Sequence, residues 1–472
     1  MRQRHTRIIA TLGPACDSVE MIRQLICSGA DVFRINASHA DNNTLIQYVK
    51  AVREASEKCS VYAGILLDLQ GPKIRLGAFR NGFATLRTGG TFSITTDEMQ
   101  GTDEQASTTY RDFVNDVRPG DKVLLADGAV ELVVKNKEGA TAECAVVRGG
   151  MVSNHQGINL PGTPISAPSL TEKDLRDLQE GVRQRVDMIA LSFVRRADDI
   201  TELRKILQQQ SAQVPIIAKI ERGEAWQGID EILQASDGSM VARGDLGVEV
   251  AMGLVPHIQK TVIDKAIQQN RFVITATQML ESMIESPVPT RAEVSDITNA
   301  IYDGTDAVML SAETARGKYP ADAVRVMAEI AESAELYLPQ RHRRVIDRTL
   351  VHYNEVIADL TCRASRIGQA KAIAVFTETG HTAHLIAAQR PDVPVFAFTP
   401  TQAIACRLSV WHGVTALLSP PLQSVEAMVE YVDHDLARRG WLHRGDSIVV
   451  AVGDRVGQAG TTNMLKVHTV SG

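Results

Sequence analysis

Eight short apolar segments recur along the chain, and the stretches between them carry apolar residues at a helical period. The apolar segments cover residues 7–12, 31–36, 63–68, 187–192, 215–220, 239–243, 272–277 and 306–311. Most are nearly continuous in Ile, Val, Leu, Ala and Met, which is typical of strands covered on both faces of a parallel sheet. Residues 19–28 and 198–210 are expected helices, and the first would be capped by Asp17 or Ser18. Eight such units predict an α/β fold of the (β/α)8 TIM barrel type.

One interval interrupts this alternation with an all-β pattern. Strands are expected there at residues 122–126, 130–134 and 141–147, with turns at 118–121, 127–128 and 136–139. We interpret residues 72–168 as a small β-barrel-like domain inserted in a loop of the barrel. An insert at that position is a candidate lid.

A second α/β unit follows the barrel. The basic stretch at residues 339–344 is the expected linker, and strands are expected at 372–376, 395–398, 447–452 and 465–470. The expected domains are the first part of the barrel (1–71), the inserted lid (72–168), the second part of the barrel (169–338) and a C-terminal α/β domain (345–472).

Composition narrows the class of protein. The formal net charge of −6 is too small to predict a nucleic-acid or membrane partner, and no apolar stretch is long enough to span a bilayer. The apolar run near the N-terminus stops at Leu12, which is too short for a secretion signal. Six irregularly spaced cysteines without a Cys-x-x-Cys pair argue against disulfides and structural zinc, as expected for a cytoplasmic protein.

Polar residues at the carboxyl ends of barrel strands are the usual catalytic set, and this chain has several. Lys219 and Glu221 end the fifth segment two residues apart, so they should point to the same side. Asp245 follows the sixth segment beside glycines. Two carboxylates are what Mg²⁺ takes from a protein when phosphate and water complete its shell. The alternatives are an exposed salt bridge and a glycine-bounded turn, and the buried strand before Lys219 weakens the first.

A second polar group follows the second and third segments. A local cationic cluster suited to phosphate would be formed by Arg34, Lys73 and Arg75. Oxygens of the kind that hold hard cations are supplied by Asn36, Ser38 and Asp68. Considered alone, each cation could equally be a solvated charge on the surface. Each oxygen, considered alone, could equally form a hydrogen bond within its loop.

Hydroxyl side chains close the ring of strand ends. Thr277 and Ser311 end the seventh and eighth segments and would face the same mouth, although a single Thr or Ser there is usually a cap. A hydroxyl-rich loop in the C-terminal domain could bind phosphate at a helix N-terminus or simply cap that helix. Its residues are Thr377, Glu378, Thr379, Gly380, His381 and Thr382.

Together these segments resemble the pyruvate kinase family over almost the whole chain. The matching signatures are residues 10–14 (ATLGP), 34–39 (RINASH), 68–75 (DLQGPKIR), 192–195 (SFVR), 218–222 (AKIER), 242–247 (ARGDLG), 276–283 (ATQMLESM) and 311–315 (SAETA). The resemblance implies transfer of the phosphoryl group of phosphoenolpyruvate to ADP, giving pyruvate and ATP in the last step of glycolysis. It also implies a cytoplasmic enzyme, in this family usually a homotetramer.

The resemblance further implies roles for the strand-end residues. Those implied to bind Mg²⁺ or Mn²⁺ are Glu221 and Asp245. Those implied to bind substrate are Arg34, Lys219, Gly244, Asp245 and Thr277, and those on the nucleotide side are Asn36, His39 and Arg75. The groups implied to act in catalysis, by charge stabilisation or by protonation of the enolate, are Arg34, Lys219, Thr277 and Ser311.

Two departures from the commonest family pattern affect its cofactors and effectors. Lys73 stands where most members have Glu, and in the family the Lys form goes with K⁺ independence. The family's K⁺ ligands persist as Asn36, Ser38, Asp68 and the carbonyl of Leu69. A fixed ammonium can replace a mobile cation, so we expect activity without K⁺. The loop at residues 377–382 lacks the family's effector-binding lysine, which implies allosteric activation by a sugar monophosphate or AMP.

Two other functions would use the same residues. A Mg²⁺-dependent lyase or aldolase acting on a pyruvate enolate would need Lys219, Glu221 and Asp245, but neither Arg34 nor Arg75. A sugar-phosphate-sensing protein with an inactive barrel is the other alternative, and the intact Lys219, Glu221 and Asp245 argue against it. Formation of pyruvate that depends on ADP separates the two enzymes, and a turnover assay separates both from the sensor.

Overall fold

The barrel predicted from the eight apolar segments is present. The computed structural model describes residues 4–337, 352–453 and 460–471. Eight parallel strands close in the order β1-β16-β15-β14-β13-β12-β3-β2. They are β1 (Arg7–Thr11), β2 (Val32–Asn36), β3 (Gly64–Asp68), β12 (Met188–Leu191), β13 (Ile216–Ile220), β14 (Gly238–Ala242), β15 (Phe272–Ala276) and β16 (Ala307–Leu310). Nearly all of their residues are buried, because helices cover the outside and side chains fill the inside.

Helices return the chain from the end of each strand to the start of the next. They are α1 (Val19–Ser28), α2 (Asn42–Lys58), α4 (Glu172–Arg183), α5 (Ala197–Gln209), α6 (Gly223–Gln227), α7 (Ile229–Ala235), α8 (Arg243–Glu249), α9 (Val255–Gln268), α10 (Arg291–Asp303), α11 (Ala312–Ala315) and α12 (Pro320–Leu336), with short 3-10 turns at Met252–Leu254 and Glu281–Ile284. Helix α1 has the predicted bounds: Ser18 accepts the amide of Met21 at 3.2 Å, and Gly29 ends the helix at a φ of 129°.

Two sheets with one apolar core interrupt the barrel between β3 and β12. The six-stranded sheet has the order β11-β7-β8-β9-β5-β6, and β10 pairs with β4 in the other. The elements are β4 (Phe83–Leu86), β5 (Thr91–Thr95), β6 (Gln105–Ser107), α3 (Phe113–Asp116), β7 (Lys122–Leu125), β8 (Val130–Glu138), β9 (Thr141–Arg148), β10 (Gly150–Ser153) and β11 (Ile158–Asn159). The turn predicted at 136–139 is wrong. Strand β8 continues to Glu138, because a register shift between Val134 and Asn136 keeps the polar residues paired with β9, and the chain turns at Gly139.

The C-terminal unit is a five-stranded sheet in the order β19-β18-β17-β20-β21, with only β21 antiparallel to its neighbour. Its elements are α13 (Tyr353–Ile367), β17 (Ala372–Phe376), α14 (His381–Ala388), β18 (Val395–Thr399), α15 (Gln402–Leu408), β19 (Val414–Leu418), α16 (Val425–Arg438), β20 (Ser447–Gly453) and β21 (Thr462–Thr469). The edge strand β19 was not predicted, because three of its five residues are partly buried or exposed and its apolar pattern is short. The linker expected at 339–344 lies outside the described residues.

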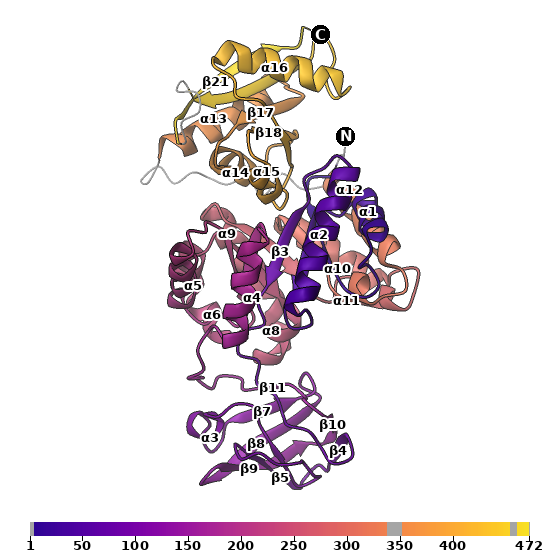
Figure 1. Ribbon diagram of the computed structural model, residues 1–472, viewed down its shortest axis with the longest axis vertical. Coiled ribbons are helices and arrows are strands. Elements are labelled where there is room, and N and C mark those ends of the chain that lie inside the picture. The colour runs from indigo at the N-terminus through magenta and orange to yellow at the C-terminus, as the bar shows by residue number, and fades with distance from the viewer. Residues whose placement is uncertain (1–3, 338–351, 454–459, 472) are drawn as a thin grey trace.

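The barrel lies between the other two units (Figure 1). The inserted sheets stand beyond the carboxyl ends of the barrel strands, which we call the mouth, and the C-terminal sheet packs at the opposite end. There, Phe272 contacts Trp411 edge-to-face at 5.1 Å, and one apolar cluster continues from the barrel interior into the C-terminal unit. All six cysteines are free. Within the described ranges, no helix has the length and apolar composition that a bilayer span requires.

Candidate active site at the mouth of the barrel

The ammonium of Lys219 joins two buried carboxylates at the mouth. Its Nζ lies 2.8 Å from Glu221 Oε1 and 3.2 Å from Asp68 Oδ1, and it donates to Ser192 Oγ at 2.7 Å. Each of these four residues is at most 8% exposed. Lys219 and Glu221 come from the end of β13, Asp68 from the end of β3 and Ser192 from the end of β12 between them. The sequence predicted the Lys219 and Glu221 pair, and the barrel adds Asp68 to it.

Arg34 extends this network to a fourth strand. Its Nε lies 2.7 Å from Asp68 Oδ2, and its Nη1 donates to Thr11 Oγ1 at 3.2 Å. Burial alone would raise the pKa of Asp68, but Lys219 and Arg34 together lower it below its ordinary value. Burial likewise opposes the charge on Lys219, and the neighbouring Asp68 and Glu221 still raise its pKa. Asp68 therefore stays ionised and holds two cations side by side.

Glu221 and Asp245 form the predicted carboxylate pair. Asp245 lies in the first turn of α8, directly after β14, which pairs with β13. Glu221 Oε2 accepts the amide of Phe193 at 2.7 Å. Burial raises the pKa of Glu221, Lys219 opposes this, and the charge of Asp245 adds to the rise. Asp68, Glu221 and Asp245 thus place three carboxylates against two cations, and this excess of negative charge fits a bound divalent cation.

No larger metal cluster accompanies this pair in the described part of the chain. There, no group of three or more His, Cys, Asp or Glu side chains is arranged to hold an ion. A cation between Glu221 and Asp245 would therefore draw its other ligands from substrate oxygens or water, which is the usual coordination of Mg²⁺.

The loop after β15 brings Thr277 against the start of α8. Gly244 donates its amide to Thr277 Oγ1 at 2.8 Å, and a Cβ on Gly244 would lie 3.6 Å from the same oxygen. Thr277 has a φ of 70°, which is costly for a β-branched residue. Its carbonyl is held by Arg243, whose guanidinium also pairs with Asp296 at 2.7 Å. The strained backbone is thus fixed by an ion pair from outside the mouth.

Ser311 presents an unusual hydroxyl at the end of β16. Its amide is held by Glu313 Oε2 at 2.6 Å, and the other oxygen of Glu313 accepts the amide of Leu280 at 3.1 Å. The hydroxyl oxygen of Ser311 is buried and has no hydrogen-bond partner among the described residues. A buried group without a partner costs stability, so such a group in a native protein needs an explanation.

The inserted unit closes one side of the mouth. A cavity of about 250 Å³ is lined from this side by Lys73, Arg75 and Asp127, and from the barrel by Arg222, Asp245 and Glu249. The tip of the insert reaches the barrel, because a Cβ on Gly128 would lie 3.8 Å from Val248, and Asn159 donates to Glu249 at 3.3 Å. Burial lowers the pKa of His39, and the charges of Lys73, Arg34 and Arg75 lower it further. Lys73 and Arg75 of the predicted cationic cluster therefore line the cavity, whereas Arg34 is bound to Asp68.

The residues predicted for K⁺ lie close together at the ends of β2 and β3, where Asn36 pairs in register with Asp68. Asn36 Oδ1 accepts the amide of Ser38 at 3.1 Å, and Leu69 donates its own amide to Ala190 at 3.0 Å. The carboxylate of Asp68 faces Arg34 and Lys219. Its oxygens are thus already matched by fixed cations.

The predicted effector loop lies in the C-terminal unit, far from the mouth (Figure 1). Thr377 Oγ1 accepts the amide of Gly380 at 2.9 Å, and the hydroxyls of Thr382 and Thr462 lie 2.7 Å apart. A cavity of about 280 Å³ is lined by Thr377, Glu378, Thr379, His381 and Thr382 of this loop. The loop therefore closes on itself before α14 and borders a cavity.

Comparison with known proteins decides the family. The family model for the pyruvate kinase barrel domain matches residues 3–324, and the model for the pyruvate kinase alpha/beta domain matches residues 355–468. The chain belongs to the pyruvate kinase family. It is 44% identical to a pyruvate kinase of Corynebacterium glutamicum, over 98% of this chain and 97% of that protein. It is 40% identical to one of Staphylococcus aureus, over 99% of this chain and 80% of that protein.

A solved structure agrees with this assignment. The fold matches the crystal structure of a pyruvate kinase from Cryptosporidium parvum with a TM-score of 0.92 and 34% identity, over 99% of this chain and 96% of that one. The chain is therefore an enzyme, a phosphotransferase of glycolysis that converts phosphoenolpyruvate and ADP to pyruvate and ATP. The family assignment supports neither a lyase nor an inactive sensor.

Sequence reasoning assigned no role to several residues of the mouth. Ser192 and Thr11 stand at strand ends and bond Lys219 and Arg34, so the strand-end rule could have found both. Asp296 lies on α10 without any local signal. Its contact with Arg243 depends on how α10 packs beside the neighbouring β14 unit, and no local sequence pattern specifies that packing.

Proposed function

We propose that phosphoryl transfer takes place beside the charge network of Lys219 and Arg34. The observation that carries this is the position of Lys219 Nζ, 2.8 Å from Glu221 and 3.2 Å from Asp68. The transferring group of a loose phosphoryl transition state carries its charge on equatorial oxygens, and fixed cations stabilise it without reorganisation. Arg34 is held by Asp68 in the same way, so both cations are positioned before substrate binds.

We propose that Glu221 and Asp245 hold Mg²⁺ or Mn²⁺. What the ion supplies when bound is positive charge for the phosphoryl and enolate oxygens. Glu221 is kept in place by the amide of Phe193 and by Lys219, and the first turn of α8 carries Asp245. Gly244, Asp245 and Thr277 would receive the substrate carboxylate, since amides at the start of a helix favour anions. The hydroxyls of Thr277 and Ser311, with water, would pass the proton to the enolate carbon.

The nucleotide would bind on the side of the inserted unit. Arg75, His39 and Asn36 are the proposed contacts, and Lys73 adds a fixed ammonium beside His39. Because that ammonium supplies the charge that K⁺ would otherwise supply, we propose that the enzyme works without K⁺. Closure of the insert, with Asp127 at its tip, would exclude water and strengthen these electrostatic contacts.

The substitution Glu221→Gln tests the metal and catalytic assignment together. It preserves size and removes one charge, so the rate of pyruvate formation with phosphoenolpyruvate and ADP should fall roughly 100-fold or more. The requirement for Mg²⁺ should move to higher concentration. Glu180→Gln is the matched control, because Glu180 is also buried but pairs with Arg183 on α4 at 3.0 Å. If Glu221→Gln behaves like Glu180→Gln, the assignment is wrong.

We propose that the loop at residues 377–382 binds a phosphorylated activator, either a sugar monophosphate or AMP. The loop borders a cavity at the N-terminus of α14, a position that favours phosphate. Activation by one of these compounds, abolished by Thr382→Val, would support the proposal. Activity that no phosphorylated compound changes would contradict it.

We also propose a cytoplasmic homotetramer. The free cysteines suit a reducing compartment. Helix α13 exposes an apolar stripe of Tyr353, Val356, Leu360 and Ile367, and β21 is an edge strand with Val467 exposed. Such surfaces mark subunit contacts. Ile367→Asp should lower the mass measured by light scattering, and a wild-type monomer would refute the proposal.

A further inference from the structure

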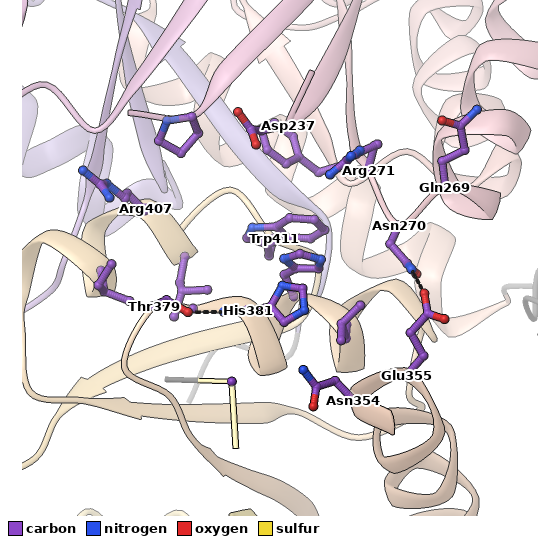
Figure 2. Close-up of a pocket in the computed structure, with 18 of the residues that line it drawn as sticks. Asp237, Gln269, Asn270, Arg271, Asn354, Glu355, Thr379, His381, Arg407 and Trp411 are labelled. Atoms are coloured by element: carbon purple, nitrogen blue, oxygen red, sulfur yellow. Dashed lines mark hydrogen bonds between the residues drawn. The ribbon is translucent and has the colours of Figure 1, made fainter. Parts of the chain in front are cut away.

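The barrel is joined to its two neighbouring units by different kinds of contact. At its lower end, opposite the mouth, Asn270 donates its side-chain amide to the carboxylate of Glu355 at 2.8 Å, which ties α13 to the barrel (Figure 2). At the mouth, the chain enters the inserted unit after β3 and returns to the barrel at α4. There, the side chains of two consecutive residues in the first turn of α4 bind backbone groups of two separate loops.

Asp174 holds the backbone where the chain leaves the barrel for the inserted unit. Its Oδ1 accepts the amide of Gly71 at 3.1 Å, and its Oδ2 accepts the amide of Thr171 at 2.8 Å in the capping box that begins α4. Gly71 has a φ of 69°, and a Cβ there would lie 3.0 Å from the ring of Phe193. Because Asp174 is fully buried, its carboxylate fixes the turn that leads to Lys73.

Lys173 holds the loop after β2. Its Nζ donates to the carbonyl of Ala37 at 2.6 Å, lies 3.5 Å from the carbonyl of Ala40, and pairs with Asp177 at 2.6 Å. The amide of Ala37 donates in turn to the carbonyl of Asp68 at 2.9 Å. Both polar groups of the Ala37 backbone are therefore bound from outside its own loop, one by the end of β3 and the other by α4.

The bond from Lys173 is of a strong kind and is held in place by a second charge. A hydrogen bond from an ammonium is roughly twice as strong as one between neutral groups. The side chain of Asp177 is 6% exposed and that of Lys173 is 35% exposed, so the buried carboxylate directs the ammonium inward towards the loop. Burial raises the pKa of Asp177 and the charge of Lys173 opposes that rise, so each charge favours the other.

We infer that Lys173 is a positioning residue for the nucleotide side of the mouth. Its ammonium fixes the backbone that carries Asn36 and His39, and Asp174 fixes the turn before Lys73. Two consecutive residues on one helical turn thus keep the loops after β2 and β3 in one relative arrangement. The inference rests on the proposed function, in which the nucleotide binds on this side. Its alternative is that Lys173 only stabilises α4 through its pair with Asp177.

Lys173→Met tests the inference, because it keeps an apolar stem and removes the ammonium. In the full-length enzyme, the KM for ADP should rise ~10-fold. The kcat and the KM for phosphoenolpyruvate should stay within about threefold of wild type, because Lys219 and Glu221 are held by other strands. Steady-state assay of pyruvate formation, with one substrate varied at a time, measures the three constants. A role limited to stabilising α4 would change none of them.

Two further variants guard this test against effects on folding. Lys137→Met is the matched control, since Lys137 also donates to two backbone carbonyls, those of Val114 at 2.6 Å and Val117 at 2.8 Å, but within the inserted unit. It should leave the KM for ADP at the wild-type value. Lys173→Gln keeps an uncharged donor and should raise the KM for ADP by less than Lys173→Met does. If the methionine variant does not fold, an unchanged KM for ADP in Lys173→Gln would overturn the inference.

Arg75→Gln separates failure of this inference from failure of the proposed nucleotide site. Arg75 lines the cavity beside the insert, so its loss should raise the KM for ADP whether or not Lys173 positions the loop. If Arg75→Gln raises that KM and Lys173→Met does not, the inference is wrong and the nucleotide site stands. If neither variant raises it, both are wrong. An equal rise in the KM for phosphoenolpyruvate in Lys173→Met would also overturn the inference, because the residue would then act on the whole mouth.

Discussion

Asp68 contacts no proposed substrate position directly, yet the arrangement of the mouth depends on it. Its two oxygens face Arg34 at 2.7 Å and Lys219 at 3.2 Å, and Ser192 donates to it at 3.3 Å. Asp68→Asn keeps the shape of the side chain and replaces one acceptor by an amide donor. That donor would face either the Nε of Arg34 or the Nζ of Lys219, so the bond to one of these two cations is lost.

The size of the effect follows from that lost bond. A hydrogen bond to a charged group contributes about 1.5–3 kcal/mol, which corresponds to roughly 10- to 150-fold in rate if it positions a group in the transition state. We expect the loss in kcat rather than in the KM for phosphoenolpyruvate, because Arg34 and Lys219 are proposed to act on charge that develops during transfer. Steady-state assay of pyruvate formation at saturating ADP and Mg²⁺ measures both constants.

A matched substitution distinguishes positioning from general damage to the fold. Asp31→Asn also removes a buried carboxylate with two cationic partners, Arg4 at 2.9 Å and Arg7 at 3.2 Å, at the opposite end of the barrel. Breaking such a pair costs about 3–5 kcal/mol of stability, but the folded fraction should keep its kcat. The reasoning is refuted if Asp68→Asn keeps kcat within threefold of wild type, or if Asp31→Asn loses as much per folded molecule.

Three further substitutions test the hydroxyl, the fixed ammonium and the buried histidine. Ser311→Ala should stabilise the protein by about 1 kcal/mol, because it removes a buried hydroxyl without a described partner. The same substitution should slow the exchange of deuterium into pyruvate ~100-fold. An unchanged exchange rate would show that Ser311 takes no part in protonation of the enolate. Lys73→Glu should make activity rise steeply with K⁺, whereas wild type should be equally active in K⁺ and in a bulky organic cation. Burial lowers the pKa of His384 from its ordinary 6.5 to about 3. The stability that depends on the neutral ring is therefore complete above the ordinary pKa and is lost as the pH falls below it. Between about pH 7.5 and about pH 5.5, the free energy of unfolding measured by denaturant titration should fall by about 1.4 kcal/mol more in wild type than in His384→Phe. Equal falls in the two proteins would show that His384 does not stay neutral.

The sequence predicted the barrel because its strands are buried on both faces, and that condition leaves continuous apolar runs. The same rule placed Lys219, Glu221 and Asp245 at strand ends, where a parallel barrel gathers them. Strand β19 escaped prediction because an edge strand keeps part of its surface exposed. The turn predicted at residues 136–139 failed because Asn and Gly signal turns, whereas here a register shift lets the strand continue.

Contacts between distant segments could not be predicted from the sequence for a different reason. The bond between Asn270 and Glu355 and the stacking of His384 on Trp411 join residues that carry no local pattern. The φ of 70° at Thr277 is likewise imposed from outside, by Arg243 and its partner Asp296. Such features follow from how finished elements pack, and composition and periodicity do not encode that packing.

Burial of charge does not by itself identify the active site, because the lower end of the barrel also carries buried ion pairs. Asp31 there is matched by two arginines, and Asp306 pairs with Arg390 at 3.1 Å. What sets the mouth apart is imbalance: Asp68 and Glu221 already share Lys219 and Arg34, and Asp245 adds a further carboxylate. Balanced pairs stabilise contacts within the fold. An unbalanced set of rigidly held charges costs stability until a ligand of opposite charge completes it, and an excess of carboxylates therefore favours the cation-bound enzyme over the free enzyme.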